Sequence, residues 1–204
     1  MEIIKKYDVT DKIFFTSDTH FGHNNIIKFC ERPFKNVEEM NQTLVNNWNK
    51  VIGPTDIVYH LGDFCFGGSA TWHHILGCLN GHIHLILGNH DEKNLRQGYM
   101  QLFESVSYQQ HIIIGPDNFY LNHYPYLCYP GHHSHTYQLF GHIHSSPYKF
   151  EGIDSSRSKK TLTPTQYDVG VDWNNFTPVS YQELIKKLEE QVNKNVNIFG
   201  TKFE

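Results

Sequence analysis

Five short clusters of Asp, Asn and His occur in this sequence, and each follows an apolar run whose residues favour β-strands. The first such run covers residues 13–16 and ends abruptly at Asp18 and His20. Open α/β sheets present their functional groups in this way, at the C-terminal ends of their strands. The pattern therefore predicts a sheet with polar side chains gathered at one edge.

The first half of the chain alternates between strand and helix patterns. The expected elements are a strand at 13–16, a helix from about residue 24, a helix over 37–51, a strand at 56–61, a helix over 69–79 and a strand at 82–87. Asn36 and Glu39 form an N-terminal capping signature for the second of these helices. This alternation favours a layered α/β arrangement.

The second half of the chain changes to short strand-like runs separated by Gly, Pro and Asn. These runs cover 106–108, 111–114, 118–122, 138–140 and 167–171, and they predict a second, mostly antiparallel sheet packed on the first. Ser180 and Glu183 cap a final helix, and residues 193–204 are expected to form a frayed polar tail. Residues 1–204 are predicted to form a single domain of α/β (α+β) class, a four-layer α-β-β-α sandwich of two packed mixed sheets flanked by helices.

Charge and composition exclude several classes of protein. With 17 Lys and Arg against 21 Asp and Glu, the net charge is −4, which argues against binding to nucleic acid or anionic membrane through bulk charge. No run of about 18 apolar residues occurs, so no membrane span is expected. Residues 1–12 are charged and contain no apolar segment, so no secretory signal is expected. The four cysteines, Cys30, Cys65, Cys78 and Cys128, are scattered, which favours reduced thiols and a cytoplasmic location.

The polar clusters supply the ligand types of a metal site. Their residues are Asp18, His20, Asp63, Asn89, His90, Asp91, His123, His142 and His144. Mixed oxygen and imidazole ligands without thiolate suit Mn²⁺, Fe or Zn²⁺. Residues two apart on extended backbone point to the same side, so Asp18 and His20 can share one ion, as can His142 and His144. Seven ligands suit two divalent ions bridged by a carboxylate, the arrangement that clamps a phosphate.

The ordered motifs D-x-H, G-D, G-N-H-D, H and G-H-x-H resemble those of the calcineurin-like metallophosphoesterase family. All five occur in order between Asp18 and His144, so the resemblance covers most of the chain. The segment 17–23, Ser-Asp-Thr-His-Phe-Gly-His, is similar to the S-D-x-H-F-G-H motif of small bacterial and phage-type phosphoesterases. The resemblance implies an enzyme, a metal-dependent phosphoric ester hydrolase.

The resemblance also implies a role for each matching residue. One metal ion would be held by Asp18, His20 and His144, a second by Asn89, His123 and His142, with Asp63 bridging the two. A metal-bound hydroxide would then attack phosphorus in line. His90 would contact the phosphoryl oxygen or protonate the leaving group, and Asp91 would orient the His90 ring. The cofactors expected are two divalent metal ions, Mn²⁺ first, with Fe and Zn²⁺ as alternatives.

Two further residues are candidates for substrate binding. His23 follows the first motif and is expected to line the cleft, and Arg32 offers a guanidinium that could bind a phosphate. A surface ion pair is the alternative interpretation of Arg32. Taken singly, Asp63 and Asn89 could also be turn residues, because each follows a glycine.

The leading hypothesis is a dinuclear phosphoesterase that acts on a small phosphorylated substrate, with a slight preference for phosphodiesters such as cyclic phosphodiesters or nucleotides. Phosphomonoesterase activity is one alternative. A nuclease acting on nucleic-acid ends is another, supported only by the small basic cluster of Arg157, Lys159 and Lys160. A non-catalytic metal-binding scaffold is the third, but such a protein is expected to lose ligands, and here all seven are present. The oligomeric state is not predicted.

Overall fold

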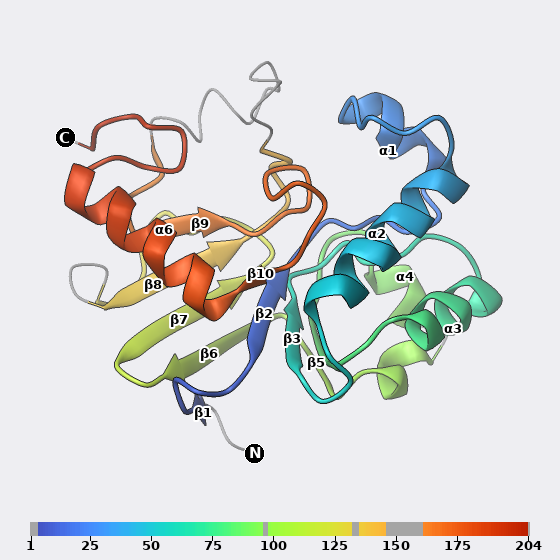
Figure 1. Ribbon diagram of the computed structural model, residues 1–204, viewed down its shortest axis with the longest axis horizontal. Coiled ribbons are helices and arrows are strands. Elements are labelled where there is room, and N and C mark those ends of the chain that lie inside the picture. The colour runs from blue at the N-terminus through green and yellow to red at the C-terminus, as the bar shows by residue number, and fades with distance from the viewer. Residues whose placement is uncertain (1–3, 96–97, 132–134, 146–160, 204) are drawn as a thin grey trace.

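The computed structural model describes residues 4–95, 98–131, 135–145 and 161–203. Within these ranges the chain forms two mixed five-stranded sheets that pack on each other, with helices outside them (Figure 1). Figure 1 shows α1 to α4 on one side of the molecule and α6 on the other. This arrangement confirms the predicted class of two packed sheets flanked by helices.

The first sheet has the strand order β10-β2-β3-β4-β5. Its strands are β2 (Ile13–Thr16), β3 (Ile57–His60), β4 (His82–Ile86), β5 (Ser105–Ser107) and β10 (Val179–Ser180). Strands β2 to β5 run parallel, and β10 lies antiparallel beside β2. The sequence placed the run at 106–108 in the second sheet, which is wrong, because β5 pairs with β4.

Helices cover the outer face of this first sheet. They are α1 (Asn24–Phe29), α2 (Val37–Val51), α3 (Ser69–Cys78), the short α4 (Glu92–Leu95) and the 3₁₀ turn η1 (Tyr99–Leu102). Asn36 caps α2 by accepting a hydrogen bond from the backbone N–H of Glu39, as the sequence predicts. Trp48 of α2 and Trp72 of α3 are buried in one cluster with the strand residue Val58.

The second sheet has the order β1-β6-β7-β8-β9. Its strands are β1 (Ile4–Tyr7), β6 (Gln109–Ile114), β7 (Asp117–Asn122), β8 (Thr136–Phe140) and β9 (Gln166–Asp168). Only the β6–β7 pair of this sheet is antiparallel, so the prediction of a mostly antiparallel sheet is wrong. Long connections lead into β8 and β9 and permit parallel pairing, whereas a short turn joins β6 to β7.

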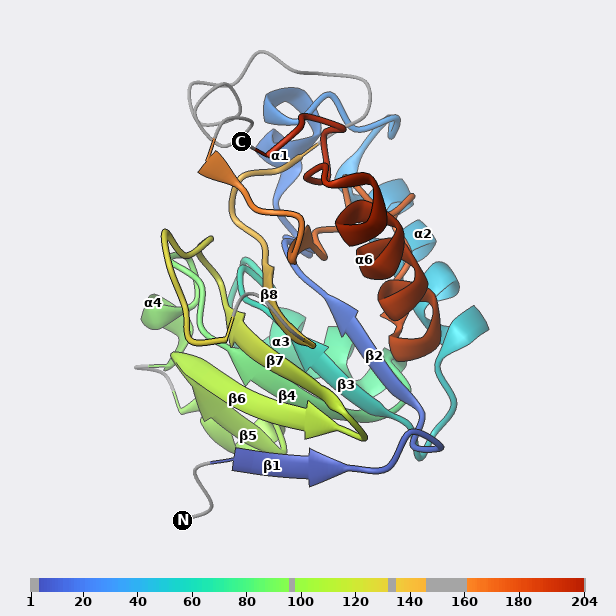
Figure 2. The same cartoon turned by 90° about the vertical axis from the view of Figure 1, so that its left-hand side faces the viewer.

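The main core lies between the two sheets, which overlap in the view of Figure 2. Alternate residues of β2 face opposite ways, so Ile13 and Phe15 pack toward the second sheet while Phe14 packs toward the helices. Phe119 and Leu139 meet them from β7 and β8.

The final helix α6 (Tyr181–Lys194) adds Leu184 and Leu188 to this core. Ser180 caps α6 by accepting a hydrogen bond from the N–H of Glu183. The segment after α6 is not the frayed tail that its polar composition predicts. Val196 bridges to Lys202, and the side chain of Asn197 is buried and donates to the carbonyl of Leu162.

Candidate metal centre

The predicted ligands lie just beyond the C-terminal ends of strands from both sheets. Asp18 and His20 follow β2, Asp63 follows β3 and Asn89 follows β4. From the second sheet, His123 follows β7, and His142 and His144 follow β8. The two sheets join at this edge, where Ser17 and Gly170 form a parallel bridge. The seven side chains therefore meet where the sheets meet.

One group of candidate ligands consists of Asp18, His20 and His144, whose ligand atoms lie within 4.8 Å of one another. His144 Nε2 is 3.7 Å from Asp18 Oδ1, and His20 Nε2 is 4.0 Å from the same oxygen. The two imidazole rings stack with centroids 5.1 Å apart. This is the set that the sequence assigned to one metal ion.

The second group centres on Asp63. Asp63 Oδ2 is 3.6 Å from His20 Nε2 and also 3.6 Å from His123 Nε2, so it lies between the two sets of ligands. Asn89 Oδ1 is 3.1 Å from His123 Nε2, and the ring of His142 lies 5.1 Å from that of His123. The carboxylate of Asp63 is therefore close to candidate ligands of both groups.

The chemistry of these residues fits divalent cations. Both ring nitrogens of His20 are buried and have no hydrogen-bond partner in the described part of the chain, an arrangement that costs free energy unless a ligand is bound. Burial and the neighbouring His144 lower the pKa of His20 well below its usual value, which leaves a neutral ring with a free lone pair. Burial and the nearby Asp18 raise the pKa of Asp63. Bound cations would stabilise both carboxylates in their charged form.

Five of the candidate ligands have left-handed backbone. The φ angles are 56° at Asp18, 50° at His20, 54° at Asp63, 68° at His142 and 45° at His144. Side chains other than glycine rarely adopt this region, and such strain collects at functional sites. The argument from extended backbone is therefore wrong for the D-x-H and G-H-x-H motifs, although each of them still brings its two candidate ligands into the site. A sharp turn after the strand, rather than strand alternation, aims them.

Two motif glycines are required by close approach. A Cβ atom at Gly88 would lie 2.2 Å from Asp63 Oδ1, and one at Gly141 would lie 2.2 Å from Asp18 Oδ2. Real Cβ atoms do not approach other atoms so closely, so only glycine fits without displacing a carboxylate. Beside Gly141, the backbone N–H of His142 donates a hydrogen bond to Asp18 Oδ2 at 2.9 Å.

Asp91 has different partners from those expected. Its carboxylate accepts hydrogen bonds from the backbone N–H groups of Asp63 (2.8 Å), Phe64 (3.0 Å) and Gly88 (2.9 Å), rather than holding the ring of His90. Burial raises the pKa of Asp91 to about 6, against the effect of these bonds. Asp91 therefore fixes the turns after β3 and β4, which carry two of the candidate ligands.

Arg32 is buried, with 4% of its surface exposed, and is neither a surface ion pair nor open to a phosphate. Nε and Nη2 donate to the two oxygens of Asp172 at 2.8 and 2.9 Å. Nη2 and Nη1 also donate to the backbone carbonyls of Asp18 and Thr19 at 2.7 and 3.0 Å. Since these bonds use the fork of the guanidinium, Arg32 holds the turn after β2 in place.

Sequence reasoning missed Asp172. Its Oδ2 lies 2.8 Å from His144 Nδ1, on the side of the ring away from Asp18. Burial opposes the charge on Asp172, but Arg32 and the bond to His144 outweigh it and lower its pKa to about 2. Such a carboxylate orients a metal-binding histidine. The signal was present in the sequence, because Asp172 follows an apolar run as the other clusters do.

Two histidines line the open side of the site. The side chain of His90 is 46% exposed, with Nε2 3.9 Å from Asp63 Oδ2. Its backbone N–H donates to Asp63 Oδ1 at 2.9 Å. His23 stacks on Phe66, with centroids 4.0 Å apart, and its ring lies 6.5 Å from that of His90. His23 therefore lies beside the candidate ligands, and its role in lining a substrate cleft stays a prediction.

The sequence profile of calcineurin-like phosphoesterases matches residues 11–197, which include all of these side chains. The chain belongs to the calcineurin-like phosphoesterase family. It is therefore a metal-dependent phosphoric ester hydrolase that acts on a phosphate ester. Among the described residues, two groups that could hold a metal ion lie at strand ends where the family motifs fall: Asp18, His20 and His144, and Asp18, Asp63 and His123. A third group consists of Cys30, His144 and Asp172.

Two proteins and one solved structure illustrate what this chain is similar to. An uncharacterized protein of Methanocaldococcus jannaschii is 37% identical over 181 residues, which cover 88% of this chain and 92% of that protein. The Gene 66 protein of Mycobacterium phage L5 is 34% identical over 131 residues, 55% of this chain and 63% of that protein. The crystal structure of a protein of unknown function from Aquifex aeolicus has a TM-score of 0.67 at 25% identity, covering 87% of this chain and 99% of that one.

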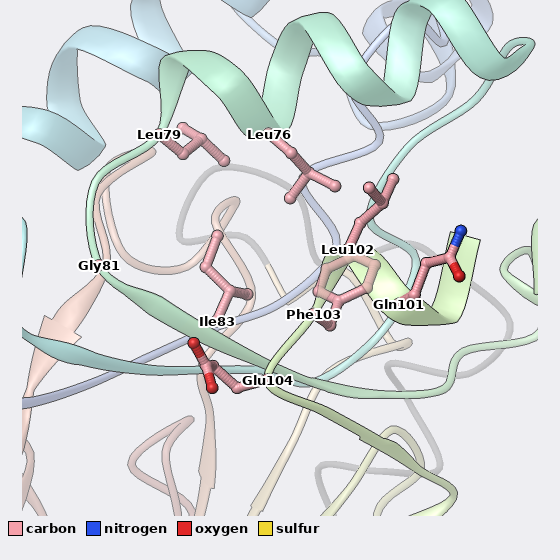
Figure 3. Close-up of a pocket in the computed structure, with 8 residues that line it drawn as sticks. All are labelled: Leu76, Leu79, Gly81, Ile83, Gln101, Leu102, Phe103 and Glu104. Atoms are coloured by element: carbon pink, nitrogen blue, oxygen red, sulfur yellow. The ribbon is translucent and has the colours of Figure 1, made fainter.

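A groove of about 330 Å³ lies away from the metal centre, between α3, η1 and β4 (Figure 3). Leu76, Ile83 and Leu102 line it, and Glu104 lies at its edge. The groove contains none of the predicted site residues and is mostly apolar in its side chains. Among the described helices, none has the length and apolar character needed to cross a membrane.

Proposed function

We propose that this phosphoesterase binds two divalent metal ions, Mn²⁺ in the first instance, and hydrolyses a phosphodiester. The observation that carries the proposal is the position of Asp63 Oδ2, equally distant from His20 and His123 of the two ligand groups. Asp18, His20 and His144 would hold one ion, and Asn89, His123 and His142 the other. Two such ions would neutralise the charge of the phosphate and lower the pKa of a bound water molecule, so that hydroxide is available at neutral pH.

The protein itself contributes orientation and a proton. Asp172 holds the ring of His144 through Nδ1, and Asp91 holds the turns that carry Asp63 and Asn89. His90 is exposed beside the shared carboxylate, so its imidazole can reach the ester oxygen of the leaving group and donate a proton to it. We assign His90 this role as general acid.

The preference for a diester rests on the exposed position of His90. Its side chain is 46% exposed beside the buried carboxylate of Asp63. A diester with substituents on both sides of phosphorus fits such an exposed position. The substrate would be a small phosphorylated molecule, such as a nucleotide or a cyclic phosphodiester.

Hydrolysis of bis(p-nitrophenyl) phosphate and p-nitrophenyl phosphate by metal-stripped protein resupplied with Mn²⁺ tests this proposal. We expect diester turnover that needs Mn²⁺ and falls at least a hundredfold in Asp63→Asn and His90→Ala. The matched control is His74→Ala, an exposed histidine on α3, which leaves turnover unchanged. Turnover of the monoester alone would replace the diesterase by a phosphatase, and absence of metal binding would leave a scaffold.

The nuclease alternative has no support from the described residues, because Arg157, Lys159 and Lys160 lie outside them. A reducing, cytoplasmic location is part of this proposal. The four cysteines all lie within the described ranges and form no disulfide bond. That location stays a prediction, as does the single domain over 1–204.

A further inference from the structure

A row of aromatic rings leads from the metal centre to solvent. The ring of Phe66 lies 5.4 Å from that of the candidate ligand His20, and His23 stacks on Phe66 at 4.0 Å with an interplanar angle of 12°. Phe29 continues the row, edge-on to His23 at 6.3 Å. We call Phe66, His23 and Phe29 the ring row. It starts beside the ion that His20 would bind and ends at the last residue of α1.

The outer end of the ring row is open. Phe29 is 68% exposed, although α1 buries Ile26 three residues earlier. A phenyl ring exposed to this extent adds little to the core, and burying it against another planar group is favourable. The other rings of the row are partly buried, so Phe29 is the ring of this row that a planar group could cover.

We propose that the ring row binds a planar aromatic group of the substrate, and that the natural substrate is a phosphoester that carries a nucleobase or a similar ring. This inference rests on the proposed function, because it assumes that the phosphate is held at the two metal sites. Stacking on Phe29 recognises the flat face of a ring and not its hydrogen-bonding edge, so several bases are accepted.

A pair of diesters with the same leaving group tests the ring row. Thymidine 5′-(p-nitrophenyl phosphate) carries a base, and methyl p-nitrophenyl phosphate does not. For the Mn²⁺-loaded full chain, we expect Phe29→Leu to lower the ratio of the two kcat/KM values about five- to tenfold, through KM of the thymidine ester. The matched control is Phe203→Leu in the C-terminal segment, which lies across the molecule from α1 (Figure 1) and leaves the ratio unchanged.

Other outcomes overturn the inference. An equal loss for both esters shows that Phe29 only supports the local fold. A lower ratio in Tyr124→Leu but not in Phe29→Leu places the base on the opposite side, where Tyr124 packs on His142. If the wild type hydrolyses neither ester, the proposed function fails. Calorimetric binding of thymidine 5′-monophosphate against inorganic phosphate then still tests the row, since Phe29→Leu must weaken only the nucleotide.

Discussion

At the scale of single residues, the site depends on backbone turns that few side chains tolerate. Asp18, Asp63 and His142 all have φ near +60°, and a buried network of hydrogen bonds holds them there. Arg32 holds the carbonyl of Asp18, and Asp91 holds the N–H of Asp63. The strained turns are therefore held by Arg32 and Asp91, which are not themselves candidate ligands.

Removing the charge of Asp172 tests this support. In Asp172→Asn the pair with Arg32 loses one charge and the bond to His144 Nδ1 weakens, so we expect the affinity for Mn²⁺ to fall about 10- to 100-fold. Competition with a fluorescent chelator measures the affinity for Mn²⁺ in wild type and variant. Asp56→Asn, at a buried carboxylate before β3, serves as the control. Equal Mn²⁺ affinities in wild type and Asp172→Asn would contradict the role.

At the scale of elements, most helices and strands could be predicted from the sequence, because their signals are local. The caps at Asn36 and Ser180 and the apolar periodicity of α2 depend on neighbouring residues alone. Strand β1 was missed because Lys5 and Lys6 break its apolar pattern, and only pairing with β6 makes it a strand. Whether β8 and β9 run parallel to their neighbours likewise depends on the whole sheet and not on local residues. For the same reason the contact between Arg32 and Asp172, which are 140 residues apart, could not be found from motifs, although Asp172 itself follows an apolar run.

Strand β4 provides a test of pH dependence. His84 stacks on Tyr59, and burial, with the nearby Lys5, lowers its pKa to about 4. The pKa of His84 in the folded state is below its unfolded value of about 6.5. Its contribution to the free energy of unfolding is therefore complete above pH 6.5 and is lost as the pH falls toward 4. We expect His84→Phe, which keeps the stack, to lose less Tm between pH 7 and 5 than wild type. His74→Phe, at an exposed histidine, keeps the wild-type slope; equal slopes in all three proteins would contradict the prediction.

At the scale of the whole molecule, the candidate ligands come from both sheets, while the core between the sheets packs beneath them. Asp18 and Asp63 follow strands of the first sheet, and His123 and His144 follow strands of the second. Metal ions at this edge would therefore add contacts between the sheets that the apolar core does not supply.

Removing metal is expected to lower the thermal stability of the entire fold. When the free concentration of an ion is 100 times its Kd for the folded chain, binding adds about 2.7 kcal/mol to the free energy of unfolding. Calorimetry with Mn²⁺ and after chelation measures the change in Tm. The variant His20→Ala, which lacks a ligand, should show a smaller difference. An unchanged Tm on chelation of the wild type would show that the ions do not join the sheets.

The bridge between Ser17 and Gly170 has a further consequence for the order in which the chain comes apart. Residues far apart in sequence meet at this edge, so ions held by Asp18 and His144 would close a long loop of chain in the way a disulfide does. Unlike a disulfide, this closure is reversible by a chelator. When force is applied between the termini, the metal-bound protein should then unfold in one step. The protein without metal should unfold in two steps, one sheet before the other.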